Sequence, residues 1–430
     1  MAASKRSIQG KFAAMNQTAI LVRQDRCAKV RNRNVECLKC AEACTSGCIS
    51  VVDGELRIDA SKCVGCGTCA TVCPTCALEA RMPCDAELAA ACEAATTDGA
   101  CVVACEPLLA AANSLIDEDA VAHVACLGRV DESLVAQTVA AGAREVVLAC
   151  GPCEACAQRH GLATANLVAE TANDLISAFG GQARISVREG LPAQVFESNA
   201  AAAEFAERLE ALRQQGCACA PLSAENVTIG KASSEAASGA LPEDVGAAGP
   251  ARGAISGESV EATDSHSSPA CKAVSADQLG FALPHVMRDG TLPHFLPERR
   301  ERLLNALSEI GEPQRPVNNR LWGAVVIDGR RCSSCRMCAT FCPTGAIRKF
   351  DNDDGTFGVM HFPGDCVKCG SCRDICPEDA ILLLDEVKPN YLMGGEVHRY
   401  AMKPRSVKID DPHQILNTMK GLIPGNLYER

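Results

Sequence analysis

The hydrophobic positions of residues 83–216 come in short continuous runs, and alanine-rich stretches separate these runs. Continuous apolar runs are typical of strands buried on both faces, and helices between them indicate parallel strands. The predicted strands are residues 100–105, 121–126, 145–150 and 183–187, and the predicted helices are residues 106–116, 132–141, 164–179 and 201–214. We therefore predict an α/β domain built on a parallel sheet.

Segments dense in cysteine flank this domain on both sides. After the α/β domain, residues 217–276 are rich in Ala, Ser, Gly, Glu and Pro and nearly lack large hydrophobic residues. They therefore cannot bury enough surface to offset the entropy of ordering. The predicted parts are a first cysteine-rich module (1–82), the α/β domain (83–216), a disordered linker (217–276), a short helical segment (277–325), a second cysteine-rich module (326–388) and a C-terminal tail (389–430) with one helix over residues 412–422.

The cysteine content separates two classes of protein. The chain has 29 cysteines among 430 residues. Disulfide frameworks belong mostly to small secreted domains, and residues 1–23 lack the apolar core of a secretory signal. We therefore expect metal-bound thiolates in a reducing cytoplasm. No run approaches the roughly 18–20 apolar residues of a membrane span, and a net charge of −11 argues against nucleic acid.

Two runs in the second module share the spacing C-x2-C-x2-C-x3-C-P, one starting at Cys332 and the other at Cys366. Two-residue gaps let three thiolates of one loop bind different irons of a single cubane, while the fourth cysteine faces the partner cluster. Zinc sites usually pair C-x2-C with a distant second pair. The spacing therefore predicts two [4Fe–4S] clusters.

This part of the chain resembles the two-[4Fe–4S] bacterial ferredoxin domain over about residues 326–388. The resemblance implies a βαββαβ fold, with a hairpin turn at residues 351–355. The predicted ligands are Cys332, Cys335, Cys338 and Cys376 for cluster three, and Cys366, Cys369, Cys372 and Cys342 for cluster four.

The first module carries the same arrangement in a less regular form. The run from Cys63 to Cys73 fits fully, but the run from Cys37 to Cys48 has an extra residue before its third cysteine and lacks the following proline. A bulge can absorb the extra residue, although cluster one could instead be labile, three-iron or absent. The predicted ligands are Cys37, Cys40, Cys44 and Cys73 for cluster one, and Cys63, Cys66, Cys69 and Cys48 for cluster two. Cys27, in the preceding basic loop, is interpreted as a spare thiol.

In the α/β domain, Cys105, Cys126 and Cys150 stand where predicted strands end. The carboxyl ends of parallel strands share one rim, where ligands usually bind, so these thiols should converge with Cys153 and Cys156 of the next turn. Buried cysteines that act as small hydrophobes are the alternative. The C-x2-C pair could also cycle between dithiol and disulfide.

The segment 126–131, followed by a helix and by residues 146–153, resembles the iron–sulfur (delta) subunit of methyl-viologen-reducing hydrogenases over roughly residues 97–190. That family passes electrons between a hydrogenase and a heterodisulfide reductase and binds a [2Fe–2S] cluster through cysteines. The chain departs from the family after Cys150, which leaves the ligands open. We favour Cys105, Cys126, Cys150 and Cys153 as metal ligands, with Cys156 and Cys101 as substitutes.

The sequence contains no G-x-G-x-x-G opening a helix after a strand and no G-x4-G-K-[ST], so no nucleotide site is visible. We predict a polyferredoxin-type electron-transfer subunit of an anaerobic redox complex, not a catalyst. It would relay single electrons between partners such as a hydrogenase, formate dehydrogenase or heterodisulfide-reductase-type enzyme, and the linker would let the second module swing between them. The alternatives are a thiol/disulfide oxidoreductase that uses the middle cysteines, and a redox-sensing scaffold.

Overall fold

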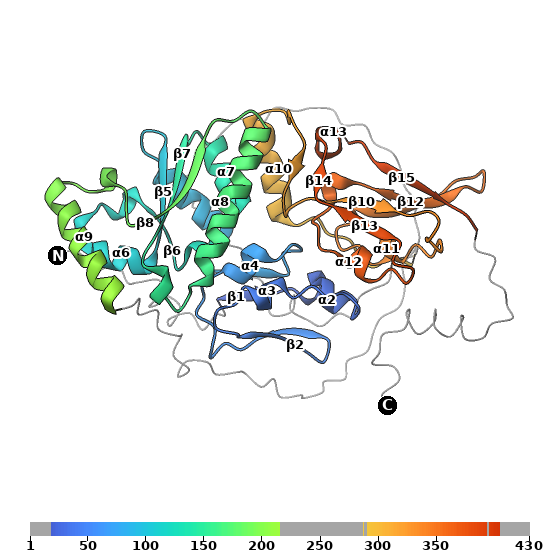
Figure 1. The fold of residues 1–430 in the computed structure, drawn as a ribbon, viewed down its shortest axis with the longest axis horizontal. Helices are drawn as coiled ribbons and strands as arrows, with labels where there is room; N and C mark the ends of the chain where they lie inside the picture. The colour runs from blue at the N-terminus through green and yellow to red at the C-terminus, as the bar shows by residue number, and fades with distance from the viewer. Residues whose placement is uncertain (1–18, 216–286, 288–289, 394, 405–430) are drawn as a thin grey trace, which may run out of the picture.

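The computed structural model describes residues 19–215, 287, 290–393 and 395–404. Figure 1 shows three parts: the α/β domain in cyan and green, the first module in blue, and the second module in orange and red. The predicted linker and the predicted helix over residues 412–422 lie outside the described residues. Within the described ranges, no helix is long and apolar enough to cross a membrane.

The α/β domain is built on a four-stranded parallel sheet, as predicted. Its strands follow the order β6-β5-β7-β8. Helix α7 contacts both α5 and α8, and α6 contacts α9, so helices cover both faces. The bounds are β5 Ala100–Cys105, β6 Ala122–Val124, β7 Glu145–Cys150, β8 Arg184–Glu189, α5 Asp85–Ala94, α6 Glu106–Ala112, α7 Glu132–Ala140, α8 His160–Ala178 and α9 Asn199–Gln215.

The first module has the predicted βαββαβ order. Its outer strands pair with each other and its inner strands form a hairpin, both antiparallel. Two short helices, η1 and α2, are inserted after the first strand. The bounds are β1 Ile20–Val22, η1 Gln24–Arg26, α2 Ala28–Arg31, α3 Lys39–Glu42, β2 Ile49–Val52, β3 Glu55–Ile58, α4 Thr68–Val72 and β4 Leu78–Ala80.

The second module repeats this order and adds strands. Strand β15 extends the β11–β12 hairpin into a three-stranded sheet, and β9 pairs with β14. The predicted turn at residues 351–355 joins β11 to β12. The bounds are β9 Val317–Asn318, β10 Ala324–Ile327, α11 Met337–Thr340, β11 Ile347–Asp351, β12 Phe357–His361, η9 Pro363–Asp365, α12 Ser371–Asp374, β13 Ile381–Leu384, β14 Glu386–Val387, α13 Pro389–Leu392 and β15 His398–Met402.

Helix α10 (Glu298–Ile310) joins the three parts and lies between α7 and the second module in Figure 1. Its apolar face packs with Phe179 of the α/β domain and with Trp322, which is fully buried, in one hydrophobic core. The expectation of a second module that swings on a tether therefore differs from the structure, in which this module is packed against the α/β domain through α10.

Candidate metal centres

Four thiols of the second module surround one small cavity. Cys332 and Cys335 lie in the loop after β10, Cys338 lies in α11 and Cys376 follows α12, and all four line the cavity beside Ile327. The structure thus brings together the four cysteines predicted for cluster three.

A second small cavity gathers the other four thiols of this module. Cys366, Cys369 and Cys372 line it from the loop and helix that follow η9, and Cys342 reaches it from the end of the preceding run. This is the set predicted for cluster four. In both cavities the fourth cysteine comes from the other run, as a pair of cubanes requires.

Backbone donors hold the last cysteine of a run in both modules. The N–H of Ala380 donates to Cys376 Sγ at 3.3 Å, and the N–H of Ala77 donates to Cys73 Sγ at 3.3 Å. A hydrogen bond to a charged sulfur stabilises its thiolate form. These positions are therefore built to carry a charged ligand.

The donor set fits an iron–sulfur cluster. Burial, reinforced by the neighbouring Cys342 thiol, raises the pKa of Cys366 to about 11 and that of Cys369 to about 12. Crowded, buried thiols ionise only when a cation compensates their charge, and bound iron supplies that charge and displaces the protons. Four soft sulfurs around a closed apolar cavity are the ligands that such clusters use.

The cysteines of the first module also form two groups. The thiols of one group lie around the loop before α4, and within this group the Sγ atoms of Cys44 and Cys48 are 3.5 Å apart. Its members are Cys44, Cys48, Cys63, Cys66 and Cys69. The predicted set for cluster two is therefore together, with Cys44 as an addition that we had expected in cluster one.

The other group contains Cys27, which we had interpreted as a spare thiol. Cys27 is buried, and burial, together with the nearby Cys73 thiol, raises its pKa to about 11. Burial raises the pKa of Cys40 to about 12, and Cys73 and Cys27 are the neighbours that contribute most. The group consists of Cys27, Cys37, Cys40 and Cys73.

The middle thiols meet at the predicted rim of the sheet. The N–H of Gly151 donates to Cys105 Sγ at 3.4 Å, and burial raises the pKa of Cys105 to about 11. The Cys153 thiol is hydrogen-bonded to Cys150, which raises the pKa of Cys153. These thiols form the rim group, which consists of Cys105, Cys126, Cys150, Cys153 and Cys156.

Cys101 does not belong to the rim group. It lies near the start of β5, whereas Cys105 is the last residue of this strand. The thiol of Cys101 donates to the carbonyl of Cys92 at 3.5 Å. The proposed substitution of Cys101 for a rim ligand is therefore wrong, because the two ends of one strand cannot serve the same site.

Comparisons with known proteins match all three parts. Family models match residues 56–79 (4Fe-4S binding domain), 94–213 (methyl-viologen-reducing hydrogenase, delta subunit) and 331–380 (4Fe-4S dicluster domain). The chain is similar to pyruvate synthase subunit PorD of Methanocaldococcus jannaschii, with 32% identity over 83 residues, 18% of this chain and 92% of that relative. The chain belongs to the 4Fe–4S ferredoxins.

A second ferredoxin of that organism, an uncharacterised one, is 38% identical over 65 residues, 15% of this chain and 42% of that relative. No solved structure shows significant similarity to the chain. Two ferredoxin modules thus flank a domain of the hydrogenase delta type, and the chain is an iron–sulfur electron-transfer protein.

Glycines bring the first ferredoxin module into close contact with the delta-type domain. A Cβ on Gly128 would lie 2.1 Å from Thr68 Oγ1 and 2.9 Å from the Cα of Gly161, and a Cβ on Gly161 would lie 2.2 Å from Cys126 Sγ. Larger residues would separate these backbones. The close approach leaves Cys66 of the ferredoxin module near enough to Cys126 of the rim group for their charges to interact.

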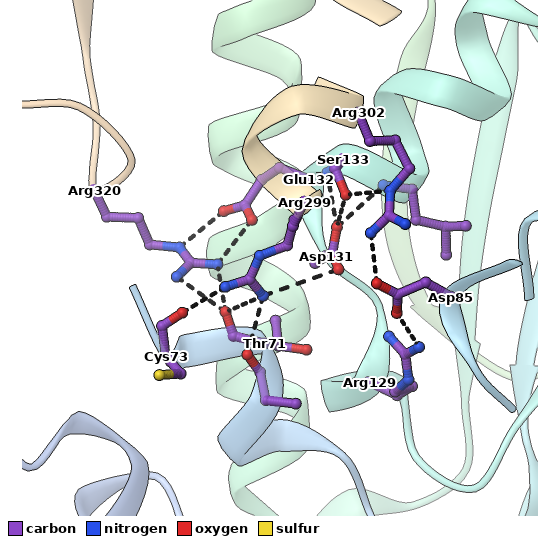
Figure 2. Close-up of polar contacts among 12 residues, drawn as sticks. Thr71, Cys73, Asp85, Arg129, Asp131, Glu132, Ser133, Arg299, Arg302 and Arg320 are labelled. Carbon is purple, nitrogen blue, oxygen red and sulfur yellow. Dashed lines mark hydrogen bonds and ion pairs between the residues drawn. The ribbon is translucent and has the colours of Figure 1, made fainter. Parts of the chain in front are cut away.

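Arginines that come after the predicted linker in the sequence bind the backbone of the first ferredoxin module. Figure 2 shows Arg299 of α10 pointing at the end of α4, where it donates to the carbonyls of Thr71, at 3.0 Å, and Cys73. The same side chain also donates to the carbonyl of Ala70 at 3.0 Å and faces Asp131 at 3.9 Å. One guanidinium thus satisfies the end of α4 and bridges it to the α/β domain.

Two more arginines complete this junction. Arg302 contacts Asp85 at 2.6 Å, and this carboxylate also pairs with Arg129 (Figure 2). The two guanidinium groups lower the pKa of Asp85, although the partial burial of this carboxylate acts in the opposite direction. Arg320 donates to both carboxylate oxygens of Glu132, each at 2.8 Å.

Proposed function

We propose that this ferredoxin relays single electrons along one row of iron–sulfur sites, from the delta-type domain through the first module to the second. When bound, each cluster takes up and releases one electron. The observation that carries the proposal is the order of the thiol groups. Cys126 of the rim group lies close enough to Cys66 for their charges to interact, and Cys69, three residues after Cys66, shares one buried core with Cys40 of the next group.

The row continues from the first module into the second. Arg31 lies close enough to Cys342 and Cys369 for their charges to interact, and it also donates to the carbonyl of Pro293 at 2.9 Å. The side chains of Cys37 and Phe341, the residue before Cys342, pack against one small core that contains Ile375. These contacts support the step from the Cys37 group to the Cys342–Cys372 cavity.

Within the second module the two cavities adjoin, since α11, which carries Cys338 of one cavity, contacts α12, which carries Cys372 of the other. The last group includes Cys335, which is exposed, and at the opposite end of the row Cys153 and Cys156 are half-buried. Both ends therefore reach the surface, where partners can dock. The [4Fe–4S] ligands of the second module are those of the two cavities, and the rim group holds a [2Fe–2S] cluster or another metal.

The delta-type domain favours one class of partner at its end of the row. Its family match names a hydrogenase subunit, so we place a hydrogenase, formate dehydrogenase or heterodisulfide-reductase-type enzyme there, and a second oxidoreductase at Cys335. In a mixture of the ferredoxin with a purified methyl-viologen-reducing hydrogenase under hydrogen, we expect the visible absorption of the clusters to bleach. Absence of bleaching, with dithionite bleaching intact, would exclude this partner.

Anaerobic purification followed by iron and sulfide analysis tests the relay itself. We expect about sixteen irons in the two modules, and magnetic coupling between neighbouring centres in the EPR spectrum of the reduced protein. Cys369→Ala should remove between about one and four irons, because a site with three thiolates keeps a three-iron cluster or empties, and it should simplify the coupling. Cys92 lies outside the thiol groups, so Cys92→Ala should change neither the iron content nor the magnetic coupling. Protein without inorganic sulfide would contradict the presence of the clusters. An EPR spectrum that is a sum of isolated centres would contradict their arrangement in one row.

A second function has one observation in its favour, the hydrogen bond between the thiols of Cys150 and Cys153. As a dithiol this pair would give two electrons and two protons to an acceptor and close to a disulfide. Alkylation of both thiols after reduction, without loss of iron, would favour this enzyme. Iron bound at the rim group and protection from alkylation would favour the relay.

A further inference from the structure

The four cysteine runs can be aligned on their short helices. In each run one cysteine is the second residue of such a helix, and the next cysteine follows four residues later. The helix cysteines are Cys40, Cys69, Cys338 and Cys372. The cysteines that follow are Cys44, Cys73, Cys342 and Cys376. On this alignment Cys44 is the last cysteine of its run, the one that crosses to the partner group in the other runs.

The backbone after these last cysteines also repeats. Three residues on, each run has a residue in the left-handed region: Gly47, Cys76, Gly345 and Asp379. One residue later stand Cys48, Ala77, Ala346 and Ala380, and a strand begins directly afterwards in every case. Cys48 therefore occupies the position that alanine fills in the three regular runs.

Side-chain contacts support the same alignment. The Sγ of Cys44 lies 3.4 Å from the hydroxyl of Ser46, two residues on. The Sγ of Cys73 lies 3.7 Å from Thr75 Oγ1, and the Sγ of Cys342 lies 3.9 Å from Thr344 Oγ1. Cys44 is thus held as the other last cysteines are, and it lies in the group with Cys66 and Cys69, the group opposite to that of its own run.

The alignment leaves the first position of this run without a thiol. The spacing from Cys37 to Cys44 matches that from Cys66 to Cys73, so the counterpart of Cys63 is Asn34, which is exposed. Cys27 is the thiol that takes this place in space. It directly precedes α2 as its N-cap residue, is buried, and belongs to the same core cluster as Cys40 and Cys73.

We infer that Cys27 is a ligand of cluster one and that Cys44, not Cys48, is the fourth ligand of cluster two. The ligand sets become Cys27, Cys37, Cys40 and Cys73 for cluster one, and Cys44, Cys63, Cys66 and Cys69 for cluster two. No bulge is needed, because the run from Cys37 to Cys44 then has regular spacing. This inference rests on the proposed function, since it assigns ligands to clusters of the relay.

Iron counting and EPR on single variants test the assignment. Cys27→Ala should lose between one and four irons per chain, because a site with three thiolates keeps a three-iron cluster or empties. Cys48→Ala should keep the full iron content and the parent spectrum. Cys44→Ala should lose iron as Cys27→Ala does. If Cys27→Ala keeps all iron, or if Cys48→Ala loses a cluster, the assignment is overturned.

Two further measurements keep the outcomes distinct. Parent protein with no iron or sulfide would overturn the proposed function itself. If Cys27→Ala does not accumulate, Cys27→Ser keeps the shape of the side chain and replaces the sulfur by a smaller oxygen. A changed EPR signal of one cluster in that variant supports ligation, and a spectrum identical to that of the parent overturns it.

Discussion

The two ferredoxin modules share one order of elements but are stabilised from different directions. The second module extends its own sheet with β15 and packs against the core around Trp322. Within residues 19–82, the first module has only two-stranded sheets, and its helix α4 is held by Arg299 from α10 and by Gly128 of the α/β domain. Small modules rarely bury enough apolar surface to be stable alone. One module therefore adds structure of its own, and the other relies on its neighbours.

Removal of Arg299 is the strongest test of this difference. Arg299→Ala leaves three carbonyls at the end of α4 without this donor and Asp131 without its cation, in a junction where the arginine side chain is only 16% exposed. Breaking a buried ionic network of this kind costs about 3–5 kcal/mol. We expect a loss of this size in the free energy of unfolding, measured anaerobically by denaturation followed with circular dichroism.

Arg315→Ala is the matched control for this prediction. Arg315 donates to Asp174 at 2.7 Å, but its side chain is 45% exposed, and exposed pairs contribute about 0–1 kcal/mol. Equal losses in the two variants would show that the first module does not depend on the junction.

The glycine contact should contribute less than the arginine. In Gly128→Ala the new methyl group meets the buried Thr68 side chain and the backbone of Gly161, neither of which can yield easily. Overpacking of this kind costs about 1–3 kcal/mol. Gly329→Ala is the control, because nothing lies within 4 Å of its added Cβ. The same denaturation experiment measures both, and similar stabilities would argue against a tight contact between the first module and the α/β domain.

The sequence predicted the regular parts of this molecule and missed what depends on distant segments. Continuous apolar runs placed β5 and β7 at the correct residues, and the second module follows its spacing. The burial of Cys27 beside Cys40 and Cys73 was missed because nothing in the local spacing ties Cys27 to Cys37, although the match between the Cys37–Cys44 and Cys66–Cys73 spacings was a usable signal. The contacts of Arg299 with α4 were beyond prediction, since more than two hundred residues separate them.

The smallest expected difference between the modules is a response to pH. His361 ends β12 opposite Ile347, the position that Ile58 holds in the first module opposite Ile49. His361 is fully buried, and the N–H of Val325 donates to its Nδ1 at 3.4 Å. Burial, with a smaller effect of the neighbouring His398, lowers the pKa of His361 to about 3.

Because this pKa lies below the ordinary histidine value of about 6.5, the unfolded chain binds the proton first as the pH falls. The stabilisation from neutral His361 is complete above about pH 6.5 and is lost from there toward pH 3, by at most about 1.4 kcal/mol per pH unit. His361→Ile, which copies the first module, should flatten this slope between pH 6.5 and 5.5, measured by anaerobic denaturation at each pH. The variant also loses the hydrogen bond from Val325, which changes its stability at every pH. The test is therefore the slope of the free energy of unfolding against pH, not the absolute stability. Equal slopes in the parent and the variant would mean that the buried histidine is not what makes the second module sensitive to acid.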